Sequence, residues 1–216
     1  MRRFASLAAA GGELAEHLQD YAGAVDTLVV AIATGGVPVG AAVARQVQLP
    51  FELLMIRRLL VPDGAAKPVC AVNVAGTLVV DDGLGPRAAT PSSGMDHAIA
   101  GALEELAQRE RAFRGERIAT ELAGKHVILV DNGIHTGSTM LSSIRALRRL
   151  ETRSIVVAIP VADQNSRAAI EQAADRVVCI FWSDKFGHAG MWYQEFVRPT
   201  EQQIQEFFTT ANIGVN

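Results

Sequence analysis

Short runs of consecutive apolar residues alternate along this chain with segments in which apolar residues recur every three or four positions. The apolar runs predict strands at 27–33, 51–56, 126–131, 154–160 and 176–181. The periodic segments predict helices at about 12–22, 37–47, 138–150, 164–173 and 200–209. Strands without polar alternation are typical of parallel sheets buried on both faces. The pattern therefore predicts an α/β fold with a doubly wound, mostly parallel central sheet and helices on both faces.

The alternation pauses between residues 60 and 122. Residues 69–82 predict two short strands about Gly76, as a hairpin or flap, and residues 95–122 predict a charged amphipathic helix or a pair of helices. We expect one domain over residues 1–216, with a core at about 12–180, a flap or insert at about 60–122 and a small C-terminal hood at about 181–210.

The apolar strand Val127 to Val130 leads directly into a loop rich in polar and small residues. A central parallel strand delivers its next residues to the carboxyl edge of the sheet, and the N-terminus of the following helix favours an anion. Carboxylate, amide and hydroxyl groups at this edge predict a site for a phosphate monoester next to a polyol. The candidate ligands are Asp131, Asn132, Gly133, Thr136, Gly137, Ser138 and Thr139.

Residues 127–139 resemble the 5-phosphoribosyl-1-pyrophosphate (PRPP) motif of type I phosphoribosyltransferases, and the likeness extends over roughly residues 12–210. The match includes Asp131 and the Thr-Gly-x-Thr pattern of 136–139, whereas Asn132 stands where the family usually has a second acid. The resemblance implies that Asp131 and Asn132 hold the ribose hydroxyls and that Thr136 to Thr139 hold the 5-phosphate. It also implies Mg²⁺, which Asp131 contacts indirectly through PRPP and water.

A second strand ends in Thr34, Gly35 and Gly36 before a helix that has Pro38 in its first turn. The resemblance implies that this is the pyrophosphate loop, although Thr34 replaces an arginine that one subgroup often has. A tight strand-to-helix turn is the alternative interpretation. Arg57 and Arg58 follow the strand 51–56 and could grip pyrophosphate oxygens, or they could be a solvated pair.

Residues 78–88 imitate both an acidic pair after a strand and a glycine-rich dinucleotide loop. Pro86 and the loop-like residues 90–94 prevent a helix from beginning at these glycines, as a dinucleotide fold requires. We interpret the segment as a turn or mobile flap, which matches the position of the family's flexible loop.

Both tryptophans lie in the hood, between residues 181 and 196. Flat side chains beyond the last strand could sandwich a planar base, and Phe186, Trp192 and Tyr193 are the candidates. The alternative is a small aromatic core that pins the C-terminal helix. His135 replaces an acid that purine-specific relatives hold near the base, so it could accept a proton from an attacking nitrogen or add charge beside phosphate. Asp131 and His135 are thus the candidate catalytic residues.

Composition limits the classes of partner. A net charge of −3 provides no overall attraction to nucleic acid or to an anionic membrane. Cys70 and Cys179 lie in valine-rich runs without metal-ligand spacing, which favours buried free thiols and a cytoplasmic location. No apolar run approaches the roughly 18 residues of a membrane span, and we interpret the N-terminal segment as a first helix. The family resemblance alone makes a homodimer plausible.

The leading hypothesis is a Mg²⁺-dependent phosphoribosyltransferase, a pentosyl-transferring glycosyltransferase of nucleotide metabolism. It would move the 5-phosphoribosyl group from PRPP to a nitrogenous base and release pyrophosphate. One alternative is a non-catalytic PRPP- or nucleotide-binding regulatory protein, which Thr34 and Asn132 favour because each reduces the charge available for transfer. Another is a hydrolase that uses water as the acceptor.

Overall fold

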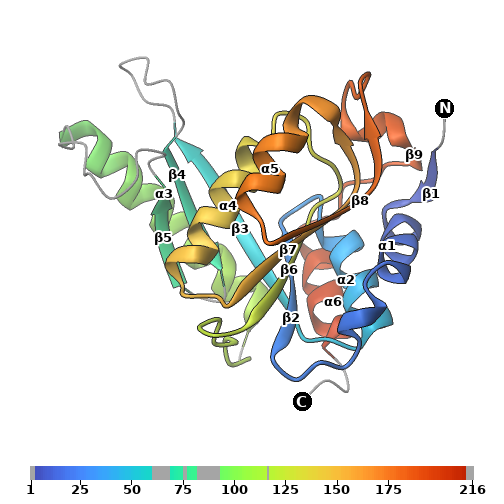
Figure 1. Ribbon diagram of the computed structural model, residues 1–216. Helices are drawn as coiled ribbons and strands as arrows, with labels where there is room; N and C mark the ends of the chain where they lie inside the picture. Colours follow the sequence, from blue (N-terminus) through green and yellow to red (C-terminus); the bar gives the residue numbers. More distant parts are fainter. Residues whose placement is uncertain (1–2, 60–68, 75–76, 82–92, 116, 213–216) are drawn as a thin grey trace.

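The computed structural model describes residues 3–59, 69–74, 77–81, 93–115 and 117–212. Within these ranges seven strands form the main sheet in the order β5-β4-β3-β2-β6-β7-β8 (Figure 1). The strands are β2 (Thr27–Ile32), β3 (Phe51–Leu59), β4 (Val69–Val74), β5 (Thr77–Asp81), β6 (His126–Val130), β7 (Ser154–Asp163) and β8 (Arg176–Ser183).

The five strands β3, β2, β6, β7 and β8 are parallel, while β4 and β5 form an antiparallel hairpin beside β3. Ala31 of β2 pairs with Val130 of β6, and Ile32 pairs with Leu54 of β3. The carboxyl ends of β2 and β6 therefore lie side by side at one edge. The predicted doubly wound, mostly parallel sheet is confirmed, and the strands about Gly76 form the expected hairpin.

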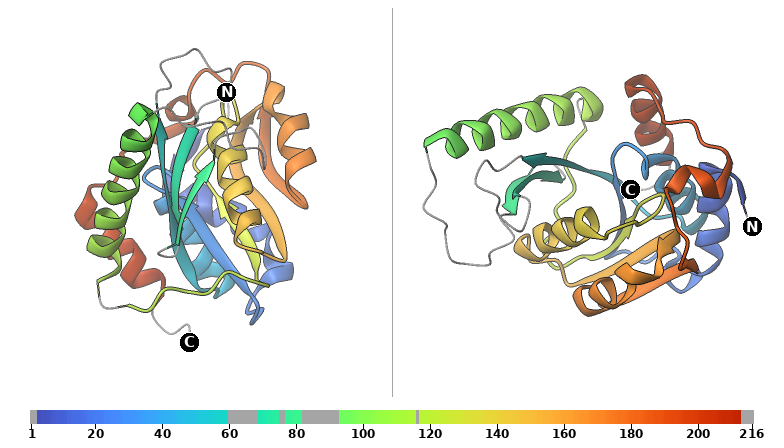
Figure 2. Two further views of the ribbon diagram at one scale, coloured as in Figure 1. Left: turned by 90° about the vertical axis from the view of Figure 1, so that its left-hand side faces the viewer. Right: turned by 90° about the horizontal axis from the view of Figure 1, so that it is seen from above.

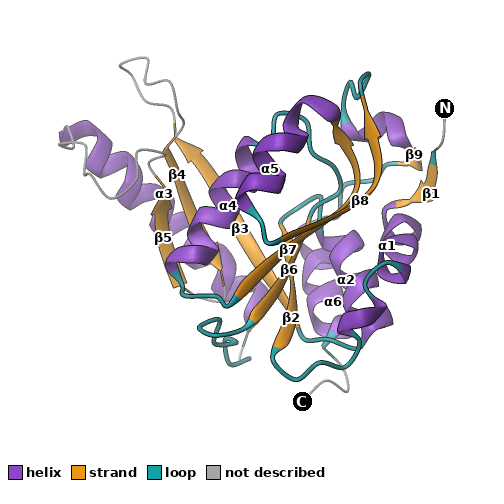
Figure 3. Ribbon diagram, in the orientation of Figure 1, coloured by secondary structure: helices purple, strands orange, loops and turns teal. Residues whose placement is uncertain are grey.

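Helices cover both faces of the sheet (Figure 2). One face carries α1 (Leu7–Glu16), α2 (Val37–Val47), α3 (Ser93–Arg114) and α6 (Glu201–Ala211), and the other carries α4 (Ser138–Arg149) and α5 (Arg167–Ala173). Strands and helices alternate along most of the chain, as the hydrophobic pattern predicts (Figure 3).

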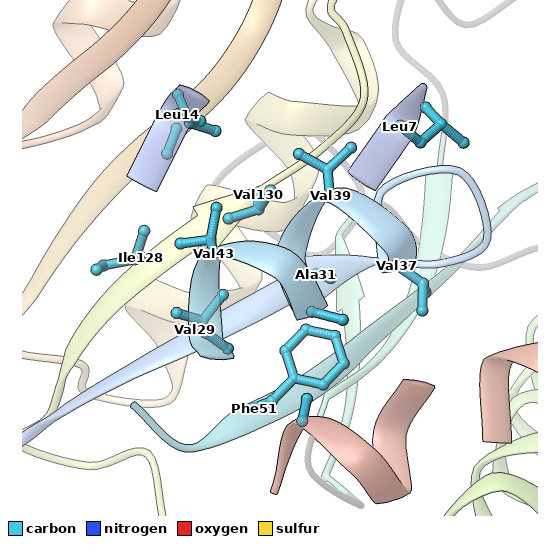
Figure 4. Close-up of a cluster of buried hydrophobic side chains, with 14 of the residues drawn as sticks. Leu7, Leu14, Val29, Ala31, Val37, Val39, Val43, Phe51, Ile128 and Val130 are labelled. Carbon is cyan, nitrogen blue, oxygen red and sulfur yellow. The ribbon is translucent and has the colours of Figure 1, made fainter. Parts of the chain in front are cut away.

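Successive residues of β2 enter two different apolar layers. Val29 and Ala31 pack with Val43 of α2 on one face (Figure 4). Val30 and Ile32 pack with the layer beneath α4 on the other face. Because both faces of the strand are buried, its sequence has no polar alternation.

Two predicted helices have different ends in the structure. Helix α1 begins at Leu7, where the Ser6 hydroxyl accepts a hydrogen bond from the Ala9 N–H at 3.1 Å, and it ends at Glu16. The predicted range of 12–22 therefore begins too late along the chain, and Gly11 lies inside the helix. A Cβ on Gly11 would come within 2.4 Å of the Val39 carbonyl oxygen, so this glycine permits close packing of α1 on α2. Helix α3 ends at Arg114, and Gly115 follows with a φ of +62°.

A second, two-stranded sheet joins the beginning of the described chain to the hood. The parallel strands β1 (Phe4–Ser6) and β9 (Tyr193–Glu195) pair with Phe4 opposite Tyr193. Short 3₁₀ helices precede β9 and occur in two connections: η1 (Gln19–Tyr21), η2 (Gln164–Ser166) and η3 (Ala189–Trp192). Figure 1 shows β1 and β9 together beside α1. The sequence did not predict this pairing.

Parts of the predicted flap lie outside the described residues. Leu78 to Asp81 belong to β5, whereas residues 82–88 of the 78–88 segment are among those not described. In the described part of the chain, no helix combines the length and apolar character needed to cross a membrane.

Candidate functional site

Two glycine-containing loops meet at the carboxyl edge of β2 and β6. Thr34, Gly35 and Gly36 follow β2, and a Cβ added to Gly35 would lie 2.5 Å from Nδ2 of Asn132. A Cβ on Gly36 would lie 2.9 Å from the Val130 carbonyl oxygen and 3.0 Å from Cα of Asp131. Glycine at both positions therefore permits the close approach of the two loops. The structure also has a cis peptide bond between Ala33 and Thr34.

The loop after β6 and the first turn of α4 line a cavity of about 250 Å³. Gly137 precedes the helix with a φ of +77°, a backbone conformation that favours glycine. The hydroxyls of Thr136 and Ser138 lie 3.2 Å apart at this helix N-terminus. Hydroxyls and main-chain N–H groups at a helix N-terminus suit a phosphate group. The cavity is lined by Asp131, Gly133, Ile134, His135, Thr136, Gly137, Ser138, Thr139 and Met140.

Asp131 provides the carboxylate of this cavity. Its Oδ1 accepts a hydrogen bond from the Asn132 N–H at 2.7 Å, but desolvation by the surrounding protein outweighs that bond and raises the pKa of Asp131 to about 7. The ionised form is therefore destabilised without a ligand. A bound cation or donating sugar hydroxyls would stabilise it.

The donor set fits a metal ion that arrives with its ligand. Among the described residues no group of three or more His, Cys, Asp or Glu side chains could hold an ion. Asp131 contributes a hard carboxylate oxygen at the cavity, which suits Mg²⁺ when phosphate oxygens and water complete the coordination.

Tyr193 supports the loop from inside the protein. Its side chain is buried, and its hydroxyl donates a hydrogen bond to the Asn132 carbonyl oxygen at 2.5 Å. Burial, together with the nearby Asp131 carboxylate, raises the pKa of Tyr193 above its ordinary value. The ring packs against Phe4, with centroids 5.6 Å apart. Tyr193 therefore joins the β1–β9 sheet to the loop that carries Asp131.

His135 extends from the same loop with 62% of its side chain exposed. One face of its ring stacks on Phe186, with centroids 5.6 Å apart and an interplanar angle of 16°. Its Nε2 lies 3.9 Å from Oδ2 of Asp163, at the end of β7. The imidazole thus lies between a buried aromatic ring and a carboxylate while it also lines the cavity.

The aromatic residues proposed to bind a base are buried in the hood. Phe186, Trp192 and Tyr193 are each at most 3% exposed, and Trp192 Nε1 donates a hydrogen bond to the Phe186 carbonyl oxygen at 2.9 Å. This burial favours the alternative of a small aromatic core. Direct contact of these rings with a base stays a prediction.

Arg57 lies on β3, three residues beyond the position that pairs with the end of β2. Its Nη1 forms an ion pair with Glu105 of α3 at 2.5 Å, and 51% of its side chain is exposed. In the structure the Arg57 guanidinium is therefore paired with a carboxylate of α3. The Arg58 side chain lies outside the described part of the structure.

Asp163, which the sequence pattern did not single out, lies beside His135. Ile134 pairs with β7, because its N–H donates to the Val161 carbonyl oxygen at 3.0 Å and its carbonyl oxygen accepts from the Asp163 N–H at 2.8 Å. This pairing sets the 131–137 loop beside the end of β7. Asp163 follows the apolar residues 155–162, so the strand-end rule that selected Asp131 would also have selected it.

Comparison with known protein sequences points to one family. The family model described as "Phosphoribosyl transferase domain" matches residues 4–195. Two Mycobacterium tuberculosis proteins, provisionally named phosphoribosyl transferases, are each 29% identical over 212 residues. These residues make up 98% of this chain but 48% of each relative, so the chain spans about half the length of these relatives.

Solved structures show the same fold. The crystal structure of TT1426 from Thermus thermophilus aligns with a TM-score of 0.81 and 25% identity, covering 97% of this chain and 99% of that one. A purine phosphoribosyltransferase from Pyrococcus horikoshii aligns with a TM-score of 0.51 and 16% identity, covering 89% and 91%.

Proposed function

The chain belongs to the phosphoribosyl transferase family, and on that premise we propose that it moves the 5-phosphoribosyl group of PRPP to a nitrogenous base and releases pyrophosphate. The observation that carries the proposal is the contact between the Thr34–Gly36 loop and the 131–139 segment at one sheet edge. One loop suits pyrophosphate and the other suits ribose 5-phosphate, so their contact supports a site for the whole PRPP molecule.

The ribose 5-phosphate half of the proposed site is the cavity before α4. Main-chain N–H groups and hydroxyls from Thr136 to Thr139 would bind the 5-phosphate. The carboxylate of Asp131 and the amide of Asn132 would accept or donate hydrogen bonds at the 2- and 3-hydroxyls of the ribose. Tyr193 fixes the Asn132 main chain and so helps to orient these groups.

The pyrophosphate half is the loop of Thr34, Gly35 and Gly36. Its main-chain N–H groups would hold the leaving group, with Arg57 or Arg58 as the nearby cations. When bound with PRPP, Mg²⁺ would supply positive charge to the departing pyrophosphate. Asp131 would help to hold the ion indirectly, through the ribose hydroxyls and water.

Transfer would occur by displacement at the anomeric carbon through an oxocarbenium-like transition state. The protein would lower the barrier by holding the ribose, screening the leaving group and positioning the attacking nitrogen. His135 is the proposed proton acceptor, since it lines the same cavity and its ring is partly exposed. Cys179 is a free thiol, which is typical of a reducing compartment, so the proposal includes a cytoplasmic location, and a homodimer stays an expectation from the family.

A non-catalytic PRPP- or nucleotide-binding protein is the second candidate function. Asn132 replaces a carboxylate of the family motif, and the Arg57 guanidinium pairs with Glu105 instead of standing free. Both features reduce the charge available to the transfer reaction while leaving the phosphate loop intact.

Calorimetric titration with PRPP and Mg²⁺, followed by a pyrophosphate-release screen over purine and pyrimidine bases, separates the candidates. Binding with base-dependent release supports the transferase, whereas binding without release supports the regulatory protein. Release without any base indicates a hydrolase. Absence of binding at millimolar PRPP would contradict all three functions. When variants of the site are measured in the same way, Gly101→Ala is a suitable control substitution, because a Cβ on that residue of α3 meets no atom within 4 Å.

A further inference from the structure

We propose that Asp163 is the positioning residue of the transfer site, which holds His135 so that its Nδ1 receives the proton lost by the attacking nitrogen of the acceptor. This inference rests on the proposed function and deepens it. It assigns a role to a residue outside the PRPP motif and specifies an acceptor that attacks through a nitrogen bearing a proton.

The backbone brings the two residues together. Hydrogen bonds between Ile134 and β7 place the residue after Ile134 beside Asp163, although the two positions are far apart in sequence. At this end of β7, Asp163 pairs with Ser183 of β8 and Ala162 forms a bridge with Ile134, so the strand is held on both sides. A functional group on such a support is held more firmly than one on an isolated loop.

The carboxylate of Asp163 is itself oriented. Its Oδ1 accepts a hydrogen bond from the Asn165 N–H at 2.8 Å, and only 13% of its side chain is exposed. Its Oδ2 faces Nε2 of His135 at 3.9 Å. This separation is suited to an electrostatic contact that shortens to a hydrogen bond when the site closes on substrate.

Phe186 limits the orientation of the imidazole ring. The His135 ring lies nearly parallel to the buried Phe186 ring, which leaves its other face and its edge exposed toward the cavity. Trp192 in turn holds the Phe186 main chain through its indole N–H. The aromatic residues Phe186 and Trp192 of the hood therefore support the imidazole ring of His135.

The chemistry follows from the two ring nitrogens. If Nε2 carries its proton toward Asp163, Nδ1 has a free lone pair. As the acceptor nitrogen forms its bond to the anomeric carbon, the C–O bond to pyrophosphate breaks and its electron pair leaves with pyrophosphate. The N–H proton moves to Nδ1, and the resulting imidazolium is stabilised by Asp163. Atoms and charge balance without an additional reagent.

Other titratable groups lie on the elements that adjoin His135, and two of them serve as control positions. Asp131 lies in the same loop, and Asp184, Lys185 and His188 lie in the hood segment around Phe186. Of the acidic side chains in the described ranges, Asp163 is the one that lies within 4 Å of the His135 ring nitrogens. Asp184 and His188 are exposed, which makes Asp184→Asn and His188→Phe matched controls.

Steady-state kinetics of four variants test the inference. His135→Phe keeps an aromatic ring on Phe186 but removes the proton acceptor, so we expect kcat to fall by about 100-fold or more with little change in KM for PRPP. Asp163→Asn should lower kcat less, by about tenfold, and should move the acidic limb of the pH profile of kcat/KM to lower pH. The two control variants should retain wild-type rates. Wild-type kcat in His135→Phe would overturn the inference.

A measurement without turnover separates this inference from the proposed function. We expect the ¹⁵N NMR signals of the neutral His135 ring, recorded on the whole chain, to show the Nε2–H tautomer in wild type and in Asp184→Asn, and a larger share of the Nδ1–H tautomer in Asp163→Asn. Identical signals in Asp163→Asn and wild type would show that Asp163 does not act on His135. If wild-type protein fails to bind PRPP, the proposed function fails, and with it the role of His135 in transfer. The NMR shift would still reveal the coupling of the two side chains.

Discussion

The hydroxyl of Tyr193 donates a hydrogen bond to the main-chain carbonyl of Asn132, which joins residues 61 positions apart in the chain. Tyr193 belongs to β9, and Asn132 lies in the cavity loop next to Asp131. A hood residue therefore supports the main chain of the loop that carries the proposed ribose-binding side chains. This relationship gives the hood a function in the site that does not require its rings to touch a base.

Removal of that hydroxyl should loosen the loop. In Tyr193→Phe the Asn132 carbonyl loses its donor, so we expect a loss of about 1–2 kcal/mol in the free energy of unfolding. PRPP affinity should fall by roughly threefold to tenfold, since up to about 1.4 kcal/mol of positioning would be lost. Chemical denaturation and calorimetry measure both effects. Tyr21→Phe is the control, because the Tyr21 hydroxyl accepts an exposed hydrogen bond from Arg176 at 3.4 Å. Equal PRPP affinity in Tyr193→Phe and wild type would contradict this role.

Gly35→Ala should damage binding more than folding. The new Cβ would come within 2.5 Å of Nδ2 at the far end of the Asn132 side chain, which can rotate away at small cost. The displaced amide would no longer face the ribose hydroxyls, so we expect PRPP affinity to fall by about tenfold or more while the melting temperature changes little. Gly101→Ala, on the open face of α3, should leave affinity unchanged and raise stability slightly. A Gly35→Ala protein that binds PRPP normally would rule out the predicted contact of Asn132 with the ligand.

The pH dependence of stability should reveal the desolvated carboxyl of Asp131. Its pKa is raised from 3.8 to about 7 in the folded protein. Between these values the unfolded chain releases the proton and the folded chain keeps it, so Asp131 reduces stability as pH rises from about 4 to about 7. Asp131→Asn removes this effect. We expect the variant to exceed wild type by up to about 4 kcal/mol at pH 8, at about 1.4 kcal/mol per pKa unit, and to match it near pH 4.

Urea unfolding of both proteins across this pH range measures the difference. Asp184→Asn, which changes an exposed carboxylate, should run parallel to wild type. PRPP binding to wild type should strengthen from pH 6 to pH 8, because in the proposed site the ionised carboxylate is the form that would interact with the magnesium complex. Parallel stability curves for Asp131→Asn and wild type would show that the carboxyl is not desolvated as described.

The ion pair between Arg57 and Glu105 should compete with pyrophosphate for the guanidinium. Glu105→Gln frees Arg57, and we expect pyrophosphate to bind up to about threefold more tightly at low salt, because an exposed pair contributes less than about 1 kcal/mol. The gain should disappear at high salt as the charges are screened. Glu104→Gln, which changes the neighbouring α3 carboxylate bonded to Gln108, is the control for competition calorimetry. Identical affinities for Glu105→Gln and wild type at low salt would show that Arg57 is not part of the proposed pyrophosphate site.

Local patterns predicted the fold well. The apolar run Val127–Val130 and the following glycine and hydroxyl residues specify a strand, a loop and a helix within a few positions, and the structure confirms each of these elements. The 37–47 helix was likewise predicted with the observed bounds. The assignment of ligand roles to Asp131, Thr136 and their neighbours stays a prediction.

Features that depend on distant contacts were not predicted. The hydroxyl of Tyr193 reaches Asn132 only because β9 pairs with β1, and neither three-residue strand has a pattern that identifies its partner. Gly11 falls just outside the predicted helix of 12–22, since the close packing on α2 that makes a glycine useful there is invisible along one chain. Sequence also showed aromatic residues in the hood without showing that they face inward.

The pairing of Phe4 with Tyr193 has a consequence for biosynthesis. A chain emerging from the ribosome can build the proposed phosphate-binding turn as soon as β6 and α4 are complete, but β9 begins 44 residues after α4 ends. Until then β1 has no partner strand, and Asn132 lacks the hydroxyl that holds its carbonyl. Competence to bind PRPP should therefore appear late and abruptly during translation, after both ends of the described chain have met.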